Sequence, residues 1–548
     1  MKSTKNSVPE VPFEHFFTYA EVERFLKEMA SSRPNLTKLT SLGKSREGRE
    51  IWCLTVTDFR AGAPEDKPAY VIHGNIHAVE LSGTHAALYT ARELLAGYPQ
   101  KTKILQPVAF HIIPRINPDG AEVVATNSGV VRSRIDRSSL PPNTLVQKDI
   151  DGNGIVVSMR VQRPDGAYIA DPKDSRLMMR REPDSKGPFY RMFPEGEIVQ
   201  WDGSDNITVE GRYMDWNRQW AYDWKPEPEQ GGSGDFPYSE PEMRAFAEFV
   251  TGRPNIFGIL GYHTGPAAFL RPPSSPDDNA LDEGDVRKME EFGAVAKKHT
   301  GLPCVPVYRY CEKKSRGATL HGHFPTTGYQ HWGLFVFEFE LGRIMDSAGM
   351  DFDTQLSWGT DEERQAGERR LMRWWDRRGR KPLIFLPWKR FNHPQLGPVE
   401  IGGEVWSARA GMTMPDLKKR CAGTYQFTLH HAAQHPHVSI ENVEAKNVAG
   451  DVWRIRARIA NRGAFPTHVS NRGAKLSRLR TVCVQFSPDQ DAELLSLTGH
   501  QDIGHLAGLT GSRRIEWFVR ARKGAACCIE AKGGTGGNCA QTVRLTCT

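Results

Sequence analysis

Hydrophobic and polar positions near the start of the chain recur with the period of an α-helix. Apolar side chains are spaced three and four apart over residues 22–29, after Thr18 and Glu21, which have the spacing of a helix-capping box. The pattern stops before Pro34, which cannot continue a helix. These features predict an amphipathic helix at the beginning of the first domain.

Short runs rich in β-branched residues come next and predict strands at residues 51–56, 69–73 and 108–113. A helical pattern over residues 80–95 lies between the second and the third of these strands. Strand, helix and strand in this order predict an α/β sheet whose faces are covered by helices.

Two later runs, residues 255–262 and 334–341, are hydrophobic at nearly every position, as expected of central strands. Before them, residues 136–212 lose the regular pattern and become rich in Gly, Pro and Asp. We therefore expect a first domain at residues 1–384, with a long insertion at residues 136–212.

A second domain is expected at residues 437–548, where the pattern changes to a period of two. Apolar residues alternate with arginines over residues 453–459, as in a strand with one solvent-facing side. Residues 385–436 are expected to hold a hairpin and a helix that connect the two domains. Further short runs between Gly-rich turns complete a predicted antiparallel β-sandwich, at residues 479–486, 515–521 and 542–546.

The composition is that of a folded globular protein. Hydrophobic residues make up 39% and charged residues 25% of the 548 positions, which excludes a disordered, collagen-like or coiled-coil chain. The net charge of +7 is small against 72 basic and 65 acidic residues, so no nucleic-acid partner is expected. The basic run at residues 369–381 lies on a helical pattern opened by Thr360 and Glu363, and we expect it to be a solvated helix face.

The apolar pattern also predicts no membrane partner. No stretch approaches 18 uninterrupted apolar residues, and the first residues contain no apolar signal-peptide core. The nine cysteines form no CxxC pair, so we expect mostly reduced thiols and no zinc site of paired cysteines. A cytoplasmic protein is therefore expected, and the sequence leaves its oligomeric state open.

His77 and Glu80 are the first candidates for a metal site. They lie three apart in GNIHAVE, directly after the strand predicted at residues 69–73, so that an imidazole nitrogen and a carboxylate can reach one cation. His263, at the end of a later apolar strand, is the candidate third ligand. His73 lies inside its strand and is interpreted as a core histidine or one that supports the ligands.

Four more polar side chains are candidates for chemistry. Asn217 and Arg218 offer a group of hydrogen-bond donors suited to a carboxylate. Glu338 and Glu340 lie two apart at the end of an apolar strand and therefore share one face. Because a carboxylate buried in a strand is costly unless it is paired or used, this pair favours a functional interpretation.

Taken in order, these residues resemble the M14 family of zinc carboxypeptidases. The similarity covers residues 14–345, apart from the insertion, and includes the opening segment LGKSREGREIW. The family implies an α/β fold with a mixed central sheet flanked by helices, and one Zn²⁺ per chain. The matching segments are HAVE, NPDG, NR, a single histidine and FEL, at residues 77–80, 117–120, 217–218, 263 and 339–341.

The resemblance implies that His77, Glu80 and His263 bind zinc and that Glu340 is the general base acting on a zinc-bound water. Asn217 and Arg218 would hold the terminal carboxylate of a peptide substrate, which makes the reaction hydrolysis of the C-terminal peptide bond.

Two further residues of the family, an arginine and a tyrosine, have candidates in this sequence. Arg132, twelve residues after the NPDG segment, corresponds to the arginine that polarises the scissile carbonyl, with Arg134 as its substitute. The mobile tyrosine of the family has no aligned counterpart, and Tyr310 and Tyr308 are the candidates for it.

Glu338 occupies a position that resembles one lining the substrate side-chain pocket of the family. A carboxylate there would favour a substrate ending in Lys or Arg. The alternative, a salt bridge to an internal arginine, is favoured on general grounds.

The segment DIDGNG has acidic or amide side chains at alternate positions, as calcium loops do: Asp149, Asp151 and Asn153. It lacks the closing acid, because the twelfth position is Arg160. An Asx-rich turn is therefore favoured over a Ca²⁺ site.

Two other functions stay open at this point. The same HxxE metal site is compatible with a zinc amidase or deacylase of N-acyl amino acids on this fold. The chain could also be a binding protein without catalysis, although the presence of all three ligands and the base argues against that.

Overall fold

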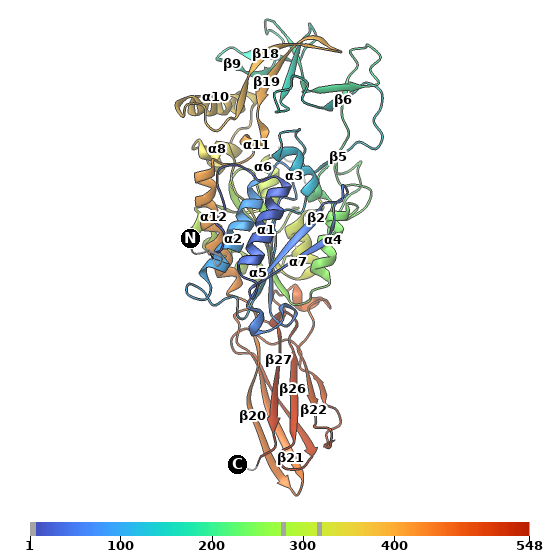
Figure 1. The fold of residues 1–548 in the computed structure, drawn as a ribbon, viewed down its shortest axis with the longest axis vertical. Helices are drawn as coiled ribbons and strands as arrows, with labels where there is room; N and C mark the ends of the chain where they lie inside the picture. Colours follow the sequence, from blue (N-terminus) through green and yellow to red (C-terminus); the bar gives the residue numbers. More distant parts are fainter. Residues whose placement is uncertain (1–6, 276–280, 315–319, 547–548) are drawn as a thin grey trace, which may run out of the picture.

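The structure, a computed structural model, describes residues 7–275, 281–314 and 320–546. It is elongated, with three parts arranged along the longest axis (Figure 1). An α/β core lies in the middle, a smaller part rich in short strands lies at one end, and the C-terminal strands lie at the other end.

An eight-stranded mixed sheet forms the centre of the core, in the order β1-β2-β4-β3-β14-β17-β15-β16. Strands β4, β3, β14 and β17 are parallel to one another, and β1 and β2 run antiparallel to their neighbours. Strand β15 is antiparallel to β17 and parallel to β16. The predicted α/β class with a mixed central sheet is confirmed. The strands are β1 (Thr37–Lys44), β2 (Glu50–Val56), β3 (Ala69–Gly74), β4 (Ala109–Ile113), β14 (Ile256–His263), β15 (Ala268–Arg271), β16 (Cys304–Pro306) and β17 (Phe335–Glu340).

Helices cover both faces of this sheet. One face carries α1 (Tyr19–Ser32), α2 (Ser82–Gly97), α5 (Glu283–Thr300) and α12 (Met414–Ala432), and the other carries α4 (Pro241–Thr251) and α7 (Phe324–Trp332). The side chains of β17 point alternately to the two faces of the sheet, which explains why helices pack on both faces. Phe337 packs against Phe292 of α5 and Phe427 of α12, whereas the neighbouring Val336 points to α7. The N-terminal helix begins at the predicted capping box.

The segment predicted as an insertion is built mostly of short strands. Its strands β7, β8, β9 and β10 join the hairpin β18–β19 in one six-stranded sheet, in which Glu400 pairs with Arg160. We call this six-stranded sheet the accessory sheet. The hairpin expected to connect the two domains is thus part of the accessory sheet. The strands are β7 (Ser158–Gln162), β8 (Tyr168–Asp171), β9 (Asp174–Arg180), β10 (Tyr190–Pro194), β18 (Phe385–His393) and β19 (Gly397–Glu404).

Smaller elements complete the first part of the chain. Two small sheets have the strand orders β11-β6-β12 and β13-β5. Their strands are β5 (Arg134–Asp136), β6 (Thr144–Gln147), β11 (Gly196–Val199), β12 (Thr208–Val209) and β13 (Arg212–Met214). The remaining helices are α3 (Pro118–Ala125), α6 (Val307–Lys314), α8 (Ile344–Ser347), α9 (Phe352–Leu356), α10 (Asp361–Arg377) and α11 (Trp406–Arg409), with short 3₁₀ turns at Phe59–Ala61, Pro64–Asp66 and Trp216–Arg218.

The C-terminal part consists of two four-stranded sheets, β20-β21-β25-β23 and β24-β22-β26-β27, around one apolar core. Trp453, Ile455 and Trp517 fill that core, as the period-two pattern predicts. The strands are β20 (Val438–Ala449), β21 (Val452–Asn461), β22 (Cys483–Ser487), β23 (Glu493–Leu494), β24 (His500–Asp502), β25 (Ser512–Arg520), β26 (Ala526–Lys532) and β27 (Asn538–Arg544), with 3₁₀ turns at Gly473–Lys475 and Gly534–Gly536.

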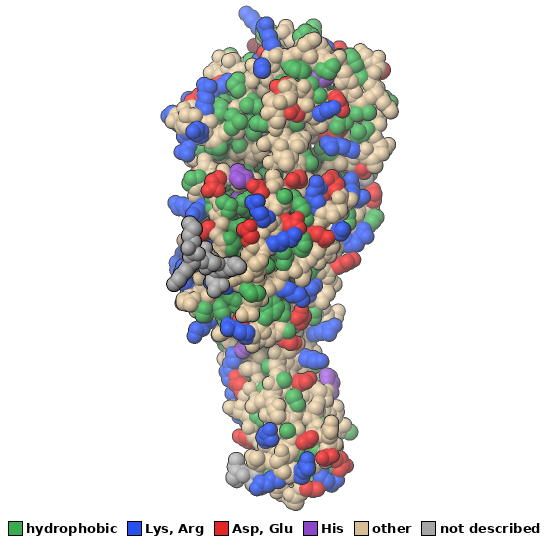
Figure 2. Space-filling view, in the orientation of Figure 1, with side chains coloured by type: hydrophobic (Ala, Val, Ile, Leu, Met, Phe, Trp, Pro, Cys, Tyr) green, Lys and Arg blue, Asp and Glu red, His purple; other side chains and the backbone are tan. Residues whose placement is uncertain are grey.

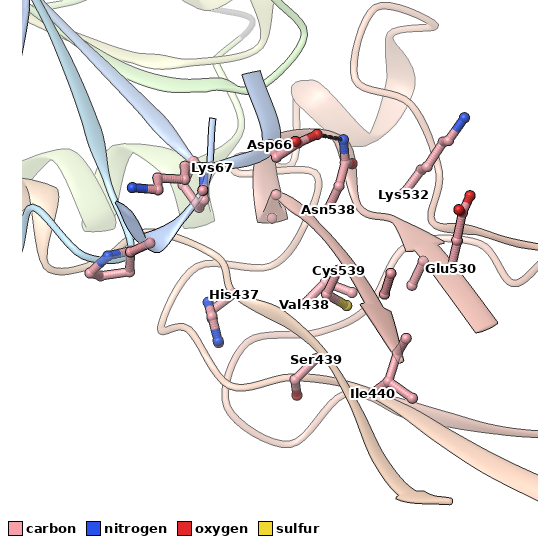
Figure 3. A pocket seen from close by; sticks show the side chains of 18 of the residues that line it. Asp66, Lys67, His437, Val438, Ser439, Ile440, Glu530, Lys532, Asn538 and Cys539 are labelled. Carbon is pink, nitrogen blue, oxygen red and sulfur yellow. Dashed lines mark hydrogen bonds between the residues drawn. The ribbon is translucent and has the colours of Figure 1, made fainter. Parts of the chain in front are cut away.

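Residues 462–480 attach the C-terminal sheets firmly to the α/β core. Phe465, Val469 and Leu479 are buried in the apolar core of the central sheet. The carboxylate of Asp285 accepts hydrogen bonds from two backbone N–H groups of this segment. A cavity of about 680 Å³ lies along the same junction, and the amide of Asn538 donates across it to Asp66 at 2.8 Å (Figure 3).

The surface carries acidic and basic side chains interspersed with apolar ones on the face shown in Figure 2. Arg369 belongs to the basic run of α10, but it is buried and bound to Asp171 and Glu362 rather than solvated. Among the described helices, none has the length and apolar character needed to cross a bilayer.

Candidate metal and substrate site

The candidate site lies at the carboxyl ends of three neighbouring parallel strands. The register places His263, the last residue of β14, beside Glu340, the last residue of β17. On its other side β14 pairs with β3, and the loop that leaves β3 carries His77 and Glu80 before α2 begins. Parallel strands bring their carboxyl ends to one edge of a sheet, which explains why residues so distant in the sequence meet here.

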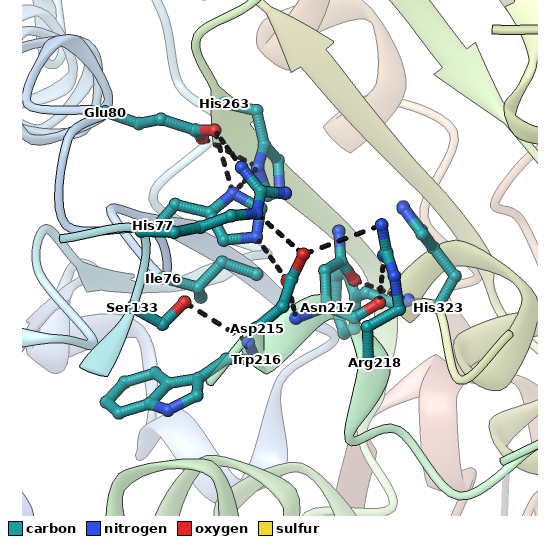
Figure 4. A network of polar contacts seen from close by, with 12 residues as sticks. Ile76, His77, Glu80, Ser133, Asp215, Trp216, Asn217, Arg218, His263 and His323 are labelled. Carbon is teal, nitrogen blue, oxygen red and sulfur yellow. Dashed lines mark hydrogen bonds and ion pairs between the residues drawn. The ribbon is translucent and has the colours of Figure 1, made fainter. Parts of the chain in front are cut away.

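His77, Glu80 and His263 converge, with one ligand atom from each lying within 4.8 Å of the others (Figure 4). The Nδ1 atoms of the two imidazoles are 3.1 Å apart, and each lies 2.8 or 2.9 Å from an oxygen of Glu80. All three side chains are buried. Two imidazole nitrogens and a carboxylate directed at one point form the donor set that suits Zn²⁺.

The outward nitrogen of each histidine contacts a carboxylate. His77 Nε2 lies 3.1 Å from Asp215 Oδ1, and His263 Nε2 lies 2.9 Å from Glu338 Oε1. Such outer carboxylates fix the ring orientation and the tautomer of a metal-binding histidine. Asp215 and Glu338 thus leave both Nδ1 atoms directed toward Glu80, an arrangement that fits a metal centre.

Asp215 joins the metal cluster to the expected substrate-binding residues. Besides His77, it contacts Arg132 Nε at 2.6 Å and Arg218 Nη2 at 3.5 Å. Burial raises the pKa of Asp215, but Arg132, Arg218 and His77 outweigh that effect and hold the pKa well below its usual range. Asp215 was not predicted from the sequence, although an acid two positions before Asn217 is a usable signal.

Glu338 requires a correction. It was expected to line a pocket for the substrate side chain, but its side chain is 1% exposed and its partner is the metal-ligand candidate His263. A second histidine, His323, lies 3.8 Å from its other oxygen. The internal-arginine alternative is not what the structure shows either. These contacts are those expected of a residue that positions His263, and not of one that lines an open substrate pocket.

Replacing Glu338 by Gln tests this positioning role. Because the variant removes the charged acceptor at His263 Nε2, we expect the zinc dissociation constant to rise by about 10- to 100-fold. Competition against a chromophoric chelator measures that constant without any assay of activity.

A suitable control for Glu338→Gln is Glu210→Gln, which neutralises another buried carboxylate, one that is paired with Arg137. An unchanged zinc dissociation constant in Glu338→Gln, or an equal change in both variants, would contradict the positioning role.

Of the two candidate arginines, Arg132 faces the site. Its Nη1 lies 3.5 Å from Glu80 Oε1, and the adjacent Asp215 and Glu80 carboxylates raise the pKa of the guanidinium against the effect of burial. Arg134 points elsewhere, to Glu240, with Nε 2.8 Å from its carboxylate. The substitute candidate is thereby excluded by its position.

Asn217 and Arg218 lie in the 3₁₀ turn Trp216–Arg218 next to Asp215 (Figure 4). Asn217 Oδ1 accepts a hydrogen bond from the backbone of Phe324 at the start of α7. This contact fixes the amide so that its NH₂ group is the part that can serve a ligand. Arg218 is 8% exposed and its Nη1 donates to the Asn217 carbonyl, so the pair forms a rigid group of donors.

Glu340 and Tyr310 flank Gly265. A Cβ atom at Gly265 would lie 2.3 Å from the Tyr310 hydroxyl and 2.8 Å from Glu340 Oε2, so a larger residue there would displace these two groups from their present positions. Burial and the Glu340 carboxylate raise the pKa of Tyr310 well above its usual value. Tyr308, the other tyrosine candidate, contacts Arg309 and lies in a different cavity, beside Arg271 and Val286.

His73 is a core residue, as one of its two interpretations held. Its ring is fully buried and packs edge-on against Phe246 and Phe324. The DIDGNG segment forms a turn in which Asp149 accepts hydrogen bonds from two backbone N–H groups. Asp149 and Asp151 approach Glu195, whose carboxylate accepts hydrogen bonds from the backbone N–H groups of Ile150 and Asp151 in the same turn.

Comparison with known proteins identifies the family. The chain belongs to the zinc carboxypeptidases, peptidase family M14, whose model matches residues 22–154 and 156–342. Residues 437–544 match a family described only as a domain of unknown function.

Similarity to individual relatives is limited to short segments. Carboxypeptidase D of Homo sapiens is 32% identical over 111 residues, which are 20% of this chain and 8% of that protein. Carboxypeptidase M of Mus musculus is 37% identical over 110 residues, 19% of this chain and 24% of that protein. The matches thus span less than a quarter of either relative. A solved carboxypeptidase A from Helicoverpa armigera covers 68% of this chain and 76% of its own at 16% identity, with a TM-score of 0.40.

Proposed function

We propose that the protein is a zinc-dependent carboxypeptidase that hydrolyses the last peptide bond of substrates with a free terminal carboxylate. The observation that carries this proposal is the convergence of His77, Glu80 and His263 at one strand edge, with Glu340 on the neighbouring strand end. Zinc held by those three residues would supply a Lewis acid that polarises the scissile carbonyl and lowers the pKa of water toward ~7.

Glu340 acts as the proton carrier in this proposal. Its carboxylate takes the proton of the attacking water and later gives it to the departing amine, so one residue serves as base and then as acid. Its position supports this role, because it lies in register with His263 across two adjacent strands. Burial at the strand end excludes competing water from the carboxylate.

Arg132, Asn217 and Arg218 orient the substrate. Arg132 faces Glu80 and would stabilise the negative charge that grows on the carbonyl oxygen. Asn217 and Arg218 would hold the terminal carboxylate. Because Asp215 contacts both Arg218 and His77, the carboxylate-binding residues lie next to the metal cluster, and only the last peptide bond of a bound substrate would lie between them. Tyr310, next to Glu340, is our assignment for the tyrosine that closes over the substrate.

Hydrolysis of three matched compounds tests the proposal. We expect the zinc-loaded protein to cleave an N-blocked dipeptide with a free carboxylate. The C-terminal amide of the same dipeptide should be cleaved about 10³-fold less efficiently, because it has no negative charge for Arg218 to bind. An N-acyl amino acid is the third compound. If only this compound is cleaved, the protein is a deacylase; if none is cleaved, the enzymatic proposal fails.

A further inference from the structure

A cavity of about 480 Å³ leads from the surface to the metal-ligand cluster. Glu80, Arg132 and Thr264 line it where it reaches the site. Its outer wall includes Trp358 and Trp406, which precede α10 and begin α11. Both lie beyond residue 342, where the match to the family ends. This cleft therefore combines residues inside the family match with residues beyond it, and its volume suits a small ligand or a short peptide.

The position of the substrate-binding residues gives the cleft a direction. Asn217 and Arg218 are not part of its lining, whereas Glu80 and Arg132 are. A peptide held by its terminal carboxylate at Asn217 and Arg218, with its last peptide bond at the metal cluster, must extend its preceding residues away from these two. The cleft is the space available on that side.

Most charges on the cleft wall are already neutralised by neighbours. Arg409 is bound by Glu368 at 2.7 Å and by Glu404 at 3.2 Å, and Arg364 is paired with Asp361. Each of these two arginines is therefore already paired with a carboxylate of the protein and is less available to an acidic group of a ligand.

Arg343 differs from the other arginines of the wall. Its Nε donates to the amide oxygen of Gln355 at 2.6 Å. Among the described residues its guanidinium forms no ion pair within 4 Å. Burial raises the pKa values of Asp346 and Glu404 and the charge of Arg343 lowers them, but both carboxylates lie beyond that distance. Arg343 lines the same cavity as Glu80 and Arg132. Trp406 adds an indole that is 43% exposed, an unusual exposure for so large an apolar group.

We propose that this cleft binds the substrate residues that precede the scissile bond and selects an acidic side chain among them. Arg343 supplies the charge-assisted hydrogen bonds to that acid, and Trp406 packs against the peptide beside it. The proposal rests on the proposed carboxypeptidase function and specifies its substrate class, which is a peptide with an acidic residue close to its C-terminus.

Matched peptides with Glu or Gln at each of the three positions before the last residue test the proposal on the zinc-loaded full chain. We expect the Glu peptide to be cleaved with a kcat/KM about tenfold higher at one of these positions, and the preference to shrink as NaCl is raised. Arg343→Gln should abolish the preference and Arg343→Lys should retain part of it. Arg364→Gln should leave the Glu preference intact, because the Arg364 guanidinium is already paired with Asp361.

The outcomes separate this proposal from the one on which it rests. Cleavage without any Glu preference at all three positions, or a preference that persists in Arg343→Gln, overturns the acid selection and leaves the carboxypeptidase function standing. Absence of cleavage for every peptide overturns both. The comparison of peptides on the unmodified protein decides the question even if a variant fails to fold.

Discussion

Replacement of Glu340 by Gln is expected to lower kcat for a blocked dipeptide by about 10²- to 10⁴-fold, which corresponds to roughly 3–5 kcal/mol of activation free energy. Gln keeps the shape of the side chain but cannot take a proton from water. Because Glu340 is not one of the three clustered ligand candidates, we expect zinc binding to persist in this variant. Steady-state kinetics and metal analysis on the same preparation check both statements.

A matched control for Glu340→Gln is Glu242→Gln on α4. Glu242 is also buried, and its carboxylate accepts a hydrogen bond from the backbone of Arg46. Comparable losses of kcat in both variants would indicate a general structural effect. An unchanged kcat in Glu340→Gln would refute the role of this carboxylate as proton carrier.

Replacement of His77 by Ala is expected to abolish stoichiometric zinc binding. The wild-type chain should retain about one Zn²⁺ after dialysis against metal-free buffer, because three protein ligands converge on one point. The variant should retain almost none. Since a ligand that binds only the folded state stabilises it, free zinc at about 1,000 times its dissociation constant should stabilise the wild type by about 4 kcal/mol and the variant not at all. Metal analysis and thermal unfolding measure the two effects.

His500, an exposed histidine of β24, provides the control for this experiment. His500→Ala should bind zinc and respond to it as the wild type does. Equal zinc contents in the wild type and His77→Ala would show that the metal binds elsewhere, and the proposed mechanism would lose its first step.

Much of the α/β core was predictable because the sequence pattern that marks each of its helices and strands lies within that element. The capping box of Thr18 and Glu21 marks the start of α1, and the apolar runs at residues 255–262 and 334–341 are β14 and β17. The accessory sheet was not predictable in the same way. Its strands are short, and β7 pairs with β19, which lies some 240 residues later in the sequence, so no local pattern reveals the partner.

The candidate site was also predictable only in part. Because successive side chains of a strand point to opposite faces, Glu338 and Glu340 lie on one face, as the sequence indicates. This alternation cannot show that Glu338 lies opposite Gly261, where the missing side chain leaves space for the carboxylate to reach His263. That contact depends on the register between two strands about 80 residues apart, which alternation alone does not determine.

The burial of residues 462–480 in the core has a practical consequence for anyone who shortens this protein. Phe465 stacks on Phe335 of β17 with the ring centroids 5.5 Å apart, and Leu479 lies in the same core. Removing everything after residue 436 would strip these side chains away, at roughly 1.5–3 kcal/mol each, and leave phenylalanine rings of the sheet facing water. Fragments that end at residue 436 should therefore aggregate on expression, and the α/β core should be purified only with the C-terminal sheets attached.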